Sequence, residues 1–370
     1  MDSEEIFINR IKINEVRNIK DLDIPLSATE RKHLIFTGKN GSGKTSVLLA
    51  LQMFLVQVMH NAHKSYEEYT FHLNALQEQL NIESNQLRAA QLKGKIDAYK
   101  NQLSIFGGIE INFKNATNIS LESKQGNFLI AYFDAKRTAS LSTPNGITKV
   151  TLKKQYSPTD KANTAFIQYI VNLKAERSFA RDDGDMEEVE RIDQWFTQLE
   201  NRLQDIFEAP SLKLVFDRKN YNFLIEIDGK LPFSLTELSD GHSAILSIIS
   251  ELILRMDAIE RGNYHLQGIV LIDEIEAHIH VNLQKKILPF LTDFFPHLQF
   301  IITTHSPFVL SSISNSVICD LQHEIVTTDL SGYSYDALIE SYFGSDKYSQ
   351  VLKDKLARYE SLSGDIKNIG

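Results

Sequence analysis

The stretch Gly38–Thr45 constrains this chain more than any other. It reads Gly-Lys-Asn-Gly-Ser-Gly-Lys-Thr and matches G-x-x-x-x-G-K-[ST], in which glycines let backbone N–H groups turn toward phosphate oxygens. His33–Thr37 before it is a short apolar run suited to a buried strand, and Ser46–Met59 after it suits a helix. This pattern binds phosphate in the order strand, loop, helix, so the sequence predicts a nucleotide site here. A Gly/Ser loop with a chance lysine is the alternative, and it does not explain the flanks.

The residues of this loop have separate expected roles. Lys44 should reach the β- and γ-phosphates of ATP, and the Thr45 hydroxyl should bind Mg²⁺. The other nucleotide-binding candidates belong to the loop and the start of the helix: Gly38, Asn40, Gly41, Ser42, Gly43 and Ser46. We therefore expect ATP and Mg²⁺ as cofactors.

Composition sets the class of protein. The chain has 370 residues, which suggests two or so domains, and a net charge of −9, which argues against a surface that is basic throughout. The single cysteine, Cys319, allows no internal disulfide and suits a reducing compartment. The start, Met1–Glu5, is acidic, unlike a signal peptide. The longest apolar runs, Val47–Met59 and Ala244–Met256, are too short to span a bilayer, so we expect a cytoplasmic protein without a membrane partner.

A second motif supplies carboxylates. Gly268–Ile272 is an apolar run followed directly by Asp273 and Glu274, which a buried strand would hold at its carboxyl end beside the phosphate loop. We expect Asp273 to bind Mg²⁺, usually through water. Glu274 is the expected general base that polarises the attacking water, because in-line attack on a γ-phosphate needs a metal and a water-orienting carboxylate.

Two further motifs follow the order found in a known family. Leu238–His242 reads Leu-Ser-Asp-Gly-His before an apolar helix, and Thr303–Pro307 reads Thr-Thr-His-Ser-Pro. Alone, the first indicates a helix N-cap and His305 a structural histidine. Together with the earlier motifs they resemble the signature motif and switch-histidine loop of ABC-type ATPases. The resemblance implies that two heads sandwich two nucleotides. Ser239 and Gly241 would then contact the γ-phosphate held by the other subunit, and His305 would hydrogen-bond the γ-phosphate and sense its loss.

Departures from the transporter pattern narrow the resemblance. Asp240 and His242 replace the Gly and Gln of the transporter motif, and Glu276–His280 follows the second carboxylate. Both resemble the RecF/SMC/Rad50 group and the OLD-type ATPases of bacterial defence systems. His278 and His280 stand two apart and would face opposite ways on a strand, so we interpret them as dimer-interface residues. The family's glutamine loop has only positional candidates here, Gln125 and Gln155.

Periodicity predicts the organisation of the chain. The 3-4 spacing of apolar residues within 61–106 predicts an inserted helical hairpin or short coiled coil, with one long helix as the alternative. The fold class expected is α/β, an ABC-type P-loop head with a mixed sheet and a helical lobe at about 160–210. The head would comprise 1–60 and 107–325, and 326–370 would form a helical, partner-docking tail.

The resemblance gives two functional hypotheses. The short head without a nuclease domain resembles the ATPase subunits of two-gene antiphage systems such as Septu and PARIS. It implies a homodimer, or a higher oligomer, that switches on ATP and controls a separate nuclease or toxin. The alternative is a RecF/SMC-like ATPase that clamps DNA. Its basic candidates are the pairs Lys136-Arg137 and Lys153-Lys154, for which a solvated face is the other interpretation. A transporter's ATPase subunit fits the departures less well.

Overall fold

The computed structural model describes residues 5–115, 119–137, 141–144 and 146–333. Among these residues, the central sheet has six strands in the order β12-β11-β3-β10-β9-β5. The strands from β11 to β5 run parallel, and β12 pairs antiparallel with β11 at one edge. Their bounds are β3 (His33–Thr37), β5 (Phe128–Phe133), β9 (Gln267–Ile272), β10 (Leu298–Thr303), β11 (Ser316–Asp320) and β12 (Ile325–Thr328).

The central strands face two cores. In β9, Ile269 and Leu271 belong to the same core as α1 (Lys44–Met59), whereas Val270 and Ile272 belong to the core that contains α7 (Asp240–Asp257). Successive side chains of a strand point to opposite faces, so a strand with helices on both sides must be apolar throughout. This explains why β9 is an uninterrupted apolar run before Asp273.

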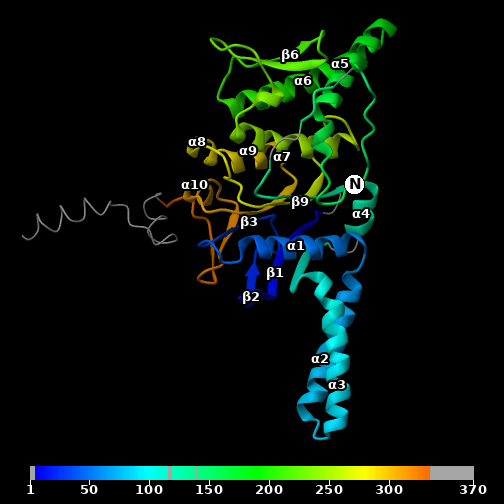
Figure 1. Ribbon diagram of the computed structural model, residues 1–370, viewed down its shortest axis with the longest axis vertical. Helices are drawn as coiled ribbons and strands as arrows, with labels where there is room; N and C mark the ends of the chain where they lie inside the picture. The colour runs from blue at the N-terminus through cyan, green and yellow to red at the C-terminus, as the bar shows by residue number, and fades with distance from the viewer. Residues whose placement is uncertain (1–4, 116–118, 138–140, 145, 334–370) are drawn as a thin grey trace, which may run out of the picture.

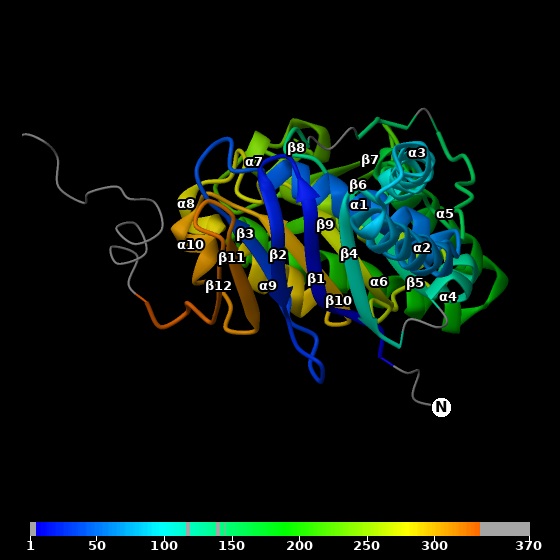
Figure 2. The ribbon, with the colours of Figure 1, turned by 90° about the horizontal axis from the view of Figure 1, so that it is seen from below.

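A second, antiparallel sheet encloses α1 from the other side. Its order is β2-β1-β4, and Figure 2 shows it in front of the central strands. Its bounds are β1 (Phe7–Val16), β2 (Ile19–Pro25) and β4 (Ile109–Lys114). The strands expected at Ile109–Phe113 and Phe128–Phe133 both exist, but they enter different sheets: β4 pairs with β1, and β5 pairs with β9.

The segment between α1 and β4 forms a hairpin that projects from the body (Figure 1). Its helices are α2 (His63–Ile82) and α3 (Gln86–Leu103), so the expected helical hairpin is confirmed and the single long helix is wrong. Asn85 ends the turn, because its side chain accepts hydrogen bonds from Leu87 N and Arg88 N and so caps α3. At the base, the Tyr66 ring meets the Phe106 ring at 4.9 Å and the Phe54 ring at 5.3 Å.

A helical lobe lies at the end of the molecule opposite the hairpin (Figure 1). It contains α5 (Phe166–Asp183) and α6 (Met186–Phe207), followed by β6 (Lys213–Asp217), β7 (Asn222–Glu226) and β8 (Phe233–Ser234). The acidic stretch expected as a turn at 182–185 begins in the last residues of α5; the turn itself is Gly184, which takes a φ of 81°, and Asp185, which caps α6. Tyr169 and Trp195 both donate to Asp257 Oδ2, which ties α5 and α6 to the end of α7.

Short elements complete the described chain: α4 (Ile119–Gln125), α8 (Val281–Gln284), α9 (Ile287–Phe294) and α10 (Pro307–Leu310). Strand β12 continues the central sheet to Thr328, and the tail helices expected after residue 334 lie outside the described residues. Cys319 is buried in the core, and burial raises its thiol pKa to about 12. Among the described residues, no single helix is long and apolar enough to cross a membrane. Only α1 and α2 taken together, across a 113° bend, pass that test of length and composition.

Candidate nucleotide site

The phosphate-loop motif occupies the turn between β3 and α1. Gly38, Gly41 and Gly43 have φ values of 133°, 84° and 99°, in the region that favours glycine. Lys44 is buried, and its Nζ donates to Gly38 O at 2.9 Å and to Lys39 O at 3.1 Å. Burial lowers the pKa of this ammonium, while the carboxylates of Glu274, Glu276, Asp273 and Asp320 act in the opposite direction. The loop thus folds around its own lysine.

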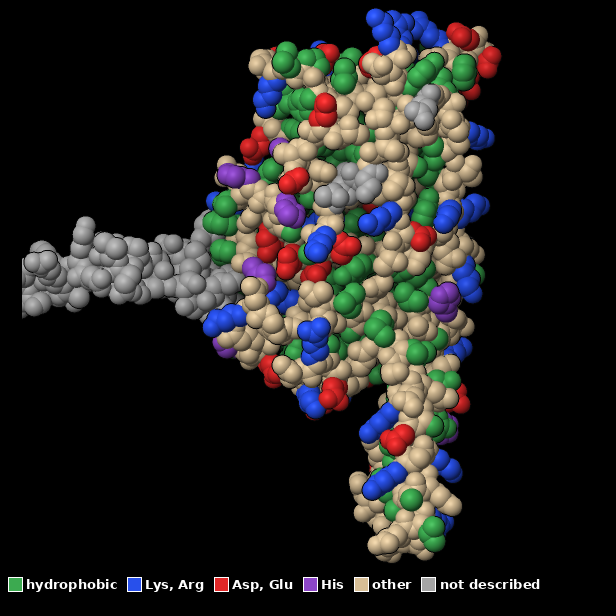
Figure 3. Space-filling model, in the orientation of Figure 1, with side chains coloured by type: hydrophobic (Ala, Val, Ile, Leu, Met, Phe, Trp, Pro, Cys, Tyr) green, Lys and Arg blue, Asp and Glu red, His purple; other side chains and the backbone are tan. Residues whose placement is uncertain are grey.

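Asp273 joins this loop to the adjoining strands. Its Oδ2 accepts from Thr45 Oγ1 at 2.9 Å, and its Oδ1 accepts from Thr303 Oγ1 at 2.6 Å. The Thr303 hydroxyl also accepts from Glu274 N at 2.7 Å, so one threonine fixes both acidic residues. Figure 3 shows Asp and Glu side chains gathered on the face over β9 and β3. The sequence analysis expected Thr45 and Asp273 at one site, and the structure places them in hydrogen-bond contact. It gave Thr303 no separate role.

Glu274 begins a sharp turn. It is half-buried and has a φ of 44°, which is unusual for a residue with a side chain. Two residues later, Glu276 accepts hydrogen bonds from Thr304 Oγ1 at 2.7 Å and from His305 N at 2.5 Å. His305 is half-buried, and its pKa is lowered by burial and by Lys44. The turn after β9 and the histidine loop after β10 are therefore bound to each other, and Glu276, named from the sequence only as a departure, is the link.

Arg137 is a site residue that the sequence analysis missed. The pair Lys136-Arg137 was expected to be a basic surface feature, but the Arg137 side chain is buried with 5% of its surface exposed. Its guanidinium donates to the carbonyl oxygens of Asp273, Glu274 and Ile275 at 2.6, 2.7 and 2.8 Å. Any residue type supplies a backbone carbonyl, so the sequence does not reveal these acceptors. The one sequence signal for Arg137 was its position a few residues after an apolar strand.

The glutamine-loop candidates lie elsewhere. Gln125 ends α4, where its side chain accepts from Asn127 Nδ2, and Gln155 is exposed in the segment that follows β5. The position after β5 and beside Asp273 instead holds Asp134 and Arg137. His278 and His280 are exposed, and His280 accepts from Asn282 N at the start of α8. Among the described residues, no group of three or more His, Cys, Asp or Glu side chains could hold a metal ion by itself.

The signature-like motif lies at the start of α7. Ser239 is exposed at the N-cap position, but its hydroxyl makes no capping hydrogen bond within the described chain. It pairs with His242 Nδ1 at 2.8 Å. The His242 ring stacks on Phe207, with centroids 4.3 Å apart. Gly241 contacts the loop after Glu274, where an added Cβ would lie 2.7 Å from His278 O. Among the described residues, no hydrogen bond joins this motif to the phosphate loop.

The residues at this site fit a magnesium nucleotide. The Ser42 hydroxyl oxygen is buried and has no hydrogen-bond partner among the described residues, so it can accept or donate to a phosphate. Lys44 is held only by loop carbonyls, which an anionic phosphate would outcompete as a partner. Thr45 and Asp273 offer the hydroxyl and carboxylate oxygens that Mg²⁺ prefers. Thr45, Asp273 and the loop are the groups that would hold it.

The chain is similar in sequence to one protein family and to several known proteins. The family described as "AAA domain, putative AbiEii toxin, Type IV TA system" matches residues 158–311, from the start of the helical lobe to the histidine loop. The Septu protein PtuA of Bacillus mycoides (strain KBAB4) is 24% identical over 96% of this chain. The Retron Vc95 probable ATPase of Vibrio cholerae serotype O1 biovar El Tor is 22% identical over 96% of this chain.

The chain spans 47% of the length of the Septu relative and 84% of the retron relative. Among solved structures, the SMC head bound to the C-terminal winged-helix domain of ScpA matches over 87% of this chain and 97% of the SMC chain, at 12% identity and a TM-score of 0.38. The sequence similarities confirm the expected resemblance to ABC-type P-loop ATPases of antiphage defence systems, Septu among them. The α/β fold class with a mixed sheet, helical lobe and inserted hairpin is confirmed as well.

Proposed function

We propose that this chain binds ATP with Mg²⁺ and hydrolyses it to ADP and phosphate. The observation that carries the proposal is the hydrogen-bonded series Thr45–Asp273–Thr303–Glu274, which ties the phosphate loop to two adjacent carboxylates. A loop that cradles phosphates beside one metal-binding and one water-orienting carboxylate is the arrangement that phosphoryl transfer to water requires. The retron relative is named a probable ATPase, which supports this activity.

The residues of the chain divide the work. Lys44 leaves the loop carbonyls to bind the β- and γ-phosphates, and the backbone N–H groups of Gly41 and Gly43 contact phosphate oxygens. Glu274 accepts a proton from the attacking water and orients it. His305 hydrogen-bonds the γ-phosphate. Mg²⁺, when bound by Thr45 and Asp273, neutralises charge on the phosphate oxygens.

We further propose that ATP drives two heads together. Ser239 and the start of α7 are exposed, and within the described chain no hydrogen bond joins them to the phosphate loop. An exposed hydroxyl at a helix N-terminus suits an anion from another molecule. Two copies arranged head to head would each supply Ser239 and Gly241 to the nucleotide held by the other.

The biological role that we infer is the sensor or regulatory subunit of a bacterial antiphage defence system. Binding of ATP would close the heads, and the hairpin or the C-terminal tail would hold a separately encoded nuclease or toxin until hydrolysis resets the pair. Similarity to a Septu protein and to one retron probable ATPase, each along 96% of the chain, supports this role. The DNA-clamp alternative is weakened because Arg137, one of its basic candidates, is buried.

The experiment uses Glu274→Gln, which should bind ATP but hydrolyse it slowly. The variant is captured with ATP from a host lysate that contains the products of its neighbouring genes, and half of the sample is treated with nuclease. We expect a stoichiometric protein partner that survives the nuclease. Bound DNA, with partners lost after nuclease, would instead favour the DNA clamp. Lys44→Ala is the control that should bind neither ATP nor the partner in an ATP-dependent way.

A further inference from the structure

A buried arginine lies directly behind the acidic turn. Arg137 follows β5 by a few residues, and its Nη1 donates to Asp273 O while its Nη2 donates to Glu274 O and Ile275 O. Nη1 also donates to Asp134 O at 3.1 Å, which closes its own segment onto the turn. One side chain therefore satisfies three successive carbonyls of the residues that carry the proposed chemistry.

These three carbonyls lie where the chain leaves strand β9. Glu274 O also accepts from Ala277 N at 2.8 Å, and Arg137 adds a side-chain donor to it and to the carbonyls of Asp273 and Ile275. Strand β9 ends at Ile272, and Glu274 has a φ of 44°, although Ile275 N still donates to Thr303 O of β10 at 3.1 Å. A residue with a side chain keeps a left-handed backbone conformation only where the surrounding structure holds it. The Arg137 guanidinium binds this turn from behind, in addition to the hydrogen bonds that Thr303 and Ala277 N make with it.

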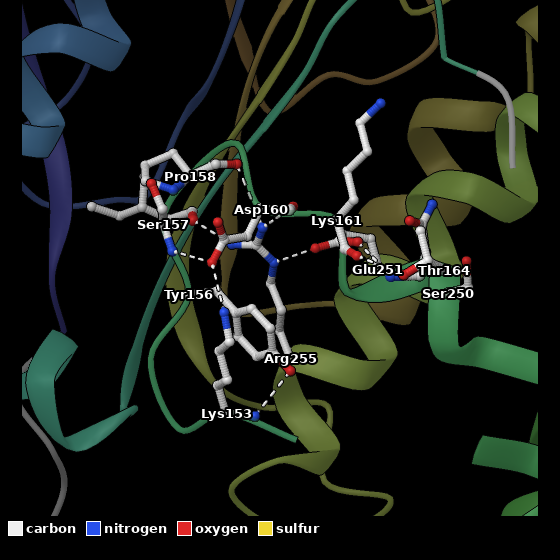
Figure 4. Close-up of polar contacts among 12 residues, drawn as sticks. Lys153, Tyr156, Ser157, Pro158, Asp160, Lys161, Thr164, Ser250, Glu251 and Arg255 are labelled. Carbon is white, nitrogen blue, oxygen red and sulfur yellow. Dashed lines mark hydrogen bonds and ion pairs between the residues drawn. The ribbon is translucent and has the colours of Figure 1, made fainter. Parts of the chain in front are cut away.

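A second buried arginine provides a contrast. Arg255 of α7 also donates to backbone carbonyls, those of Ile130 and Asp160, but its Nε donates in addition to the Glu251 carboxylate at 2.7 Å (Figure 4). Arg255 has 3% of its surface exposed and Arg137 has 5%. The charge of Arg255 is thus balanced by a carboxylate on the same helix, whereas among the described residues Arg137 donates only to carbonyls.

The charge of Arg137 is directed at the site instead. The carboxylates of Glu276, Asp134, Asp273 and Glu274 all stabilise its charged form. Burial acts against them and lowers its pKa to about 10, so the guanidinium remains charged near neutral pH. The cation therefore faces the acidic cluster without being bound to any one member, and it leaves the Glu274 side chain available.

We propose that Arg137 is the positioning residue of the Glu274 turn. It holds three carbonyls so that the Glu274 carboxylate meets the attacking water in the orientation needed for proton transfer. This inference rests on the proposed ATPase function and deepens it. In the described chain Arg137 makes no hydrogen bond to the phosphate loop or to Ser239. It does hold the Asp273 carbonyl, but the Asp273 carboxylate is held separately by Thr45 and Thr303, so loss of Arg137 should affect the hydrolytic step much more than ATP binding.

The site also permits a specific chemical test. Arg137 lines a cleft of about 90 Å³ together with Asp134, Asn163, Ser247 and Glu251. Its Nε and the Oδ1 of Asn163 have no hydrogen-bond partner among the described residues. Truncation to alanine would enlarge this cleft by the volume of the missing side chain. A free guanidinium ion could then occupy the position of the lost group and bind the same carbonyls.

The experiment compares Arg137→Ala with the matched variant Arg255→Ala. We expect Arg137→Ala to lower kcat about 100-fold while the ATP dissociation constant changes by less than about threefold, because misplacing a catalytic group by about 1 Å has this effect. Millimolar guanidinium chloride should restore part of kcat in Arg137→Ala. The same concentration of sodium chloride should not, and neither Arg255→Ala nor Glu274→Gln should respond to guanidinium.

The outcomes separate this inference from the proposed function. If the wild-type chain does not hydrolyse ATP, the proposed function fails. If the wild type hydrolyses ATP and Arg137→Ala keeps its kcat, or loses ATP affinity as much as kcat, only the positioning role is wrong. Should Arg137→Ala not fold, Arg137→Lys decides: one ammonium cannot hold three carbonyls in the fork geometry, so its kcat should fall with ATP affinity retained. An unchanged kcat in that variant would overturn the inference.

Discussion

At the scale of single residues, the Ser239 hydroxyl and the His242 ring form a pair at the start of α7. Their hydrogen bond has two orientations, because either group can donate. A hydroxyl that donates to His242 turns its lone pairs toward the outside, whereas one that accepts from Nδ1–H keeps its own proton for an incoming phosphate oxygen. We expect the second arrangement when a nucleotide from another head is bound.

Substituting His242 by phenylalanine tests this pair. His242→Phe keeps a ring stacked on Phe207 but removes the hydrogen bond to Ser239. The ATP affinity of the single head should not change. ATP-dependent dimerisation should weaken about tenfold, which corresponds to the weaker end of the free energies found for a hydrogen bond to a charged group. Sedimentation of His242→Phe combined with Glu274→Gln, with ATP present, measures the dimerisation. If His242→Phe dimerises like the parent protein while Ser239→Ala dimerises more weakly, Ser239 acts in dimerisation without help from His242.

His33 makes the fold sensitive to acid. It is the buried first residue of β3, its Nδ1 accepts from Phe300 N of β10 at 3.1 Å, and burial together with Arg31 and Lys32 lowers its pKa from 6.5 to about 4. Below pH 6.5 His33 is protonated in the unfolded chain but stays neutral in the folded chain. The stability present above that pH is therefore lost as the pH falls toward 4, by roughly 3 kcal/mol.

His33→Asn should remove this acid sensitivity, because its Oδ1 can accept from Phe300 N but does not titrate. Urea unfolding at about pH 7 and about pH 4 gives the change for each protein. Asp257 acts in the opposite direction, since burial raises its pKa to about 6 and protonation stabilises the fold, so the comparison is made between the two chains. Equal losses in both would show that His33 does not control the acid response.

The sequence determines some of these residues and conceals others. Lys44, Thr45, Asp273 and Glu274 could be assigned roles because each stands at a fixed offset from glycines or an apolar strand. Arg137 could not, because its partners are backbone carbonyls of residues far along the chain, and any residue type supplies a carbonyl. The hydrogen bond between Ser239 and His242 was missed for a different reason, because a serine at an N-cap position usually accepts from a backbone N–H of the first helical turn.

At the scale of elements, α7 carries a buried polar stripe. Ser247, Glu251 and Arg255 recur at four-residue intervals and all have less than 5% of their surface exposed. Glu251 accepts from Asn163 N at 2.8 Å as well as from Arg255, so the stripe binds α7 to the segment before α5 and, through Ile130 O, to β5. The helix that begins at Ser239 is therefore fixed to the strand that precedes Arg137.

Removing one member of this stripe should destabilise the protein. Glu251→Leu leaves the Arg255 guanidinium buried without its carboxylate, and the expected loss in the free energy of unfolding is about 3–5 kcal/mol. The double variant Glu251→Leu/Arg255→Met removes both charges and should recover much of that loss. The part due to the lost hydrogen bond from Asn163 N to Glu251 should remain. Denaturant unfolding measures both. A double variant less stable than Glu251→Leu would mean that Arg255 acts through the carbonyls alone.

Elements were easier to predict than their partners. Apolar periodicity located the hairpin helices and the strands at 109–113 and 128–133, because the signal lies within each segment. It could not tell that β4 joins the three-stranded sheet and β5 the central one, because sheet pairing joins residues that are distant in sequence. The turn at 182–185 was predictable, since Gly184 and the capping Asp185 are local devices.

At the scale of the whole molecule, the two halves of the proposed site lie apart within one chain. The phosphate loop, Asp273 and Glu274 meet at the ends of the central strands, while Ser239 is exposed at the start of α7. In the head-to-head arrangement that we propose, a second copy would complete the site. Binding of ATP and association of heads then become linked equilibria, in which the nucleotide favours the dimer by its additional contacts there.

Ser239→Arg tests this arrangement. The residue is exposed and no hydrogen bond joins it to the phosphate loop in the described chain, so ATP affinity of the single head should change by less than about threefold. A long cationic side chain at the position where the other head's phosphate must approach should abolish ATP-dependent dimerisation and, with it, most hydrolysis. Ser239→Ala is the control, which should dimerise weakly. Sedimentation with and without ATP, alongside nucleotide titration, gives both quantities. If Ser239→Arg still dimerises with ATP, the heads meet through another surface and the sandwich must be abandoned.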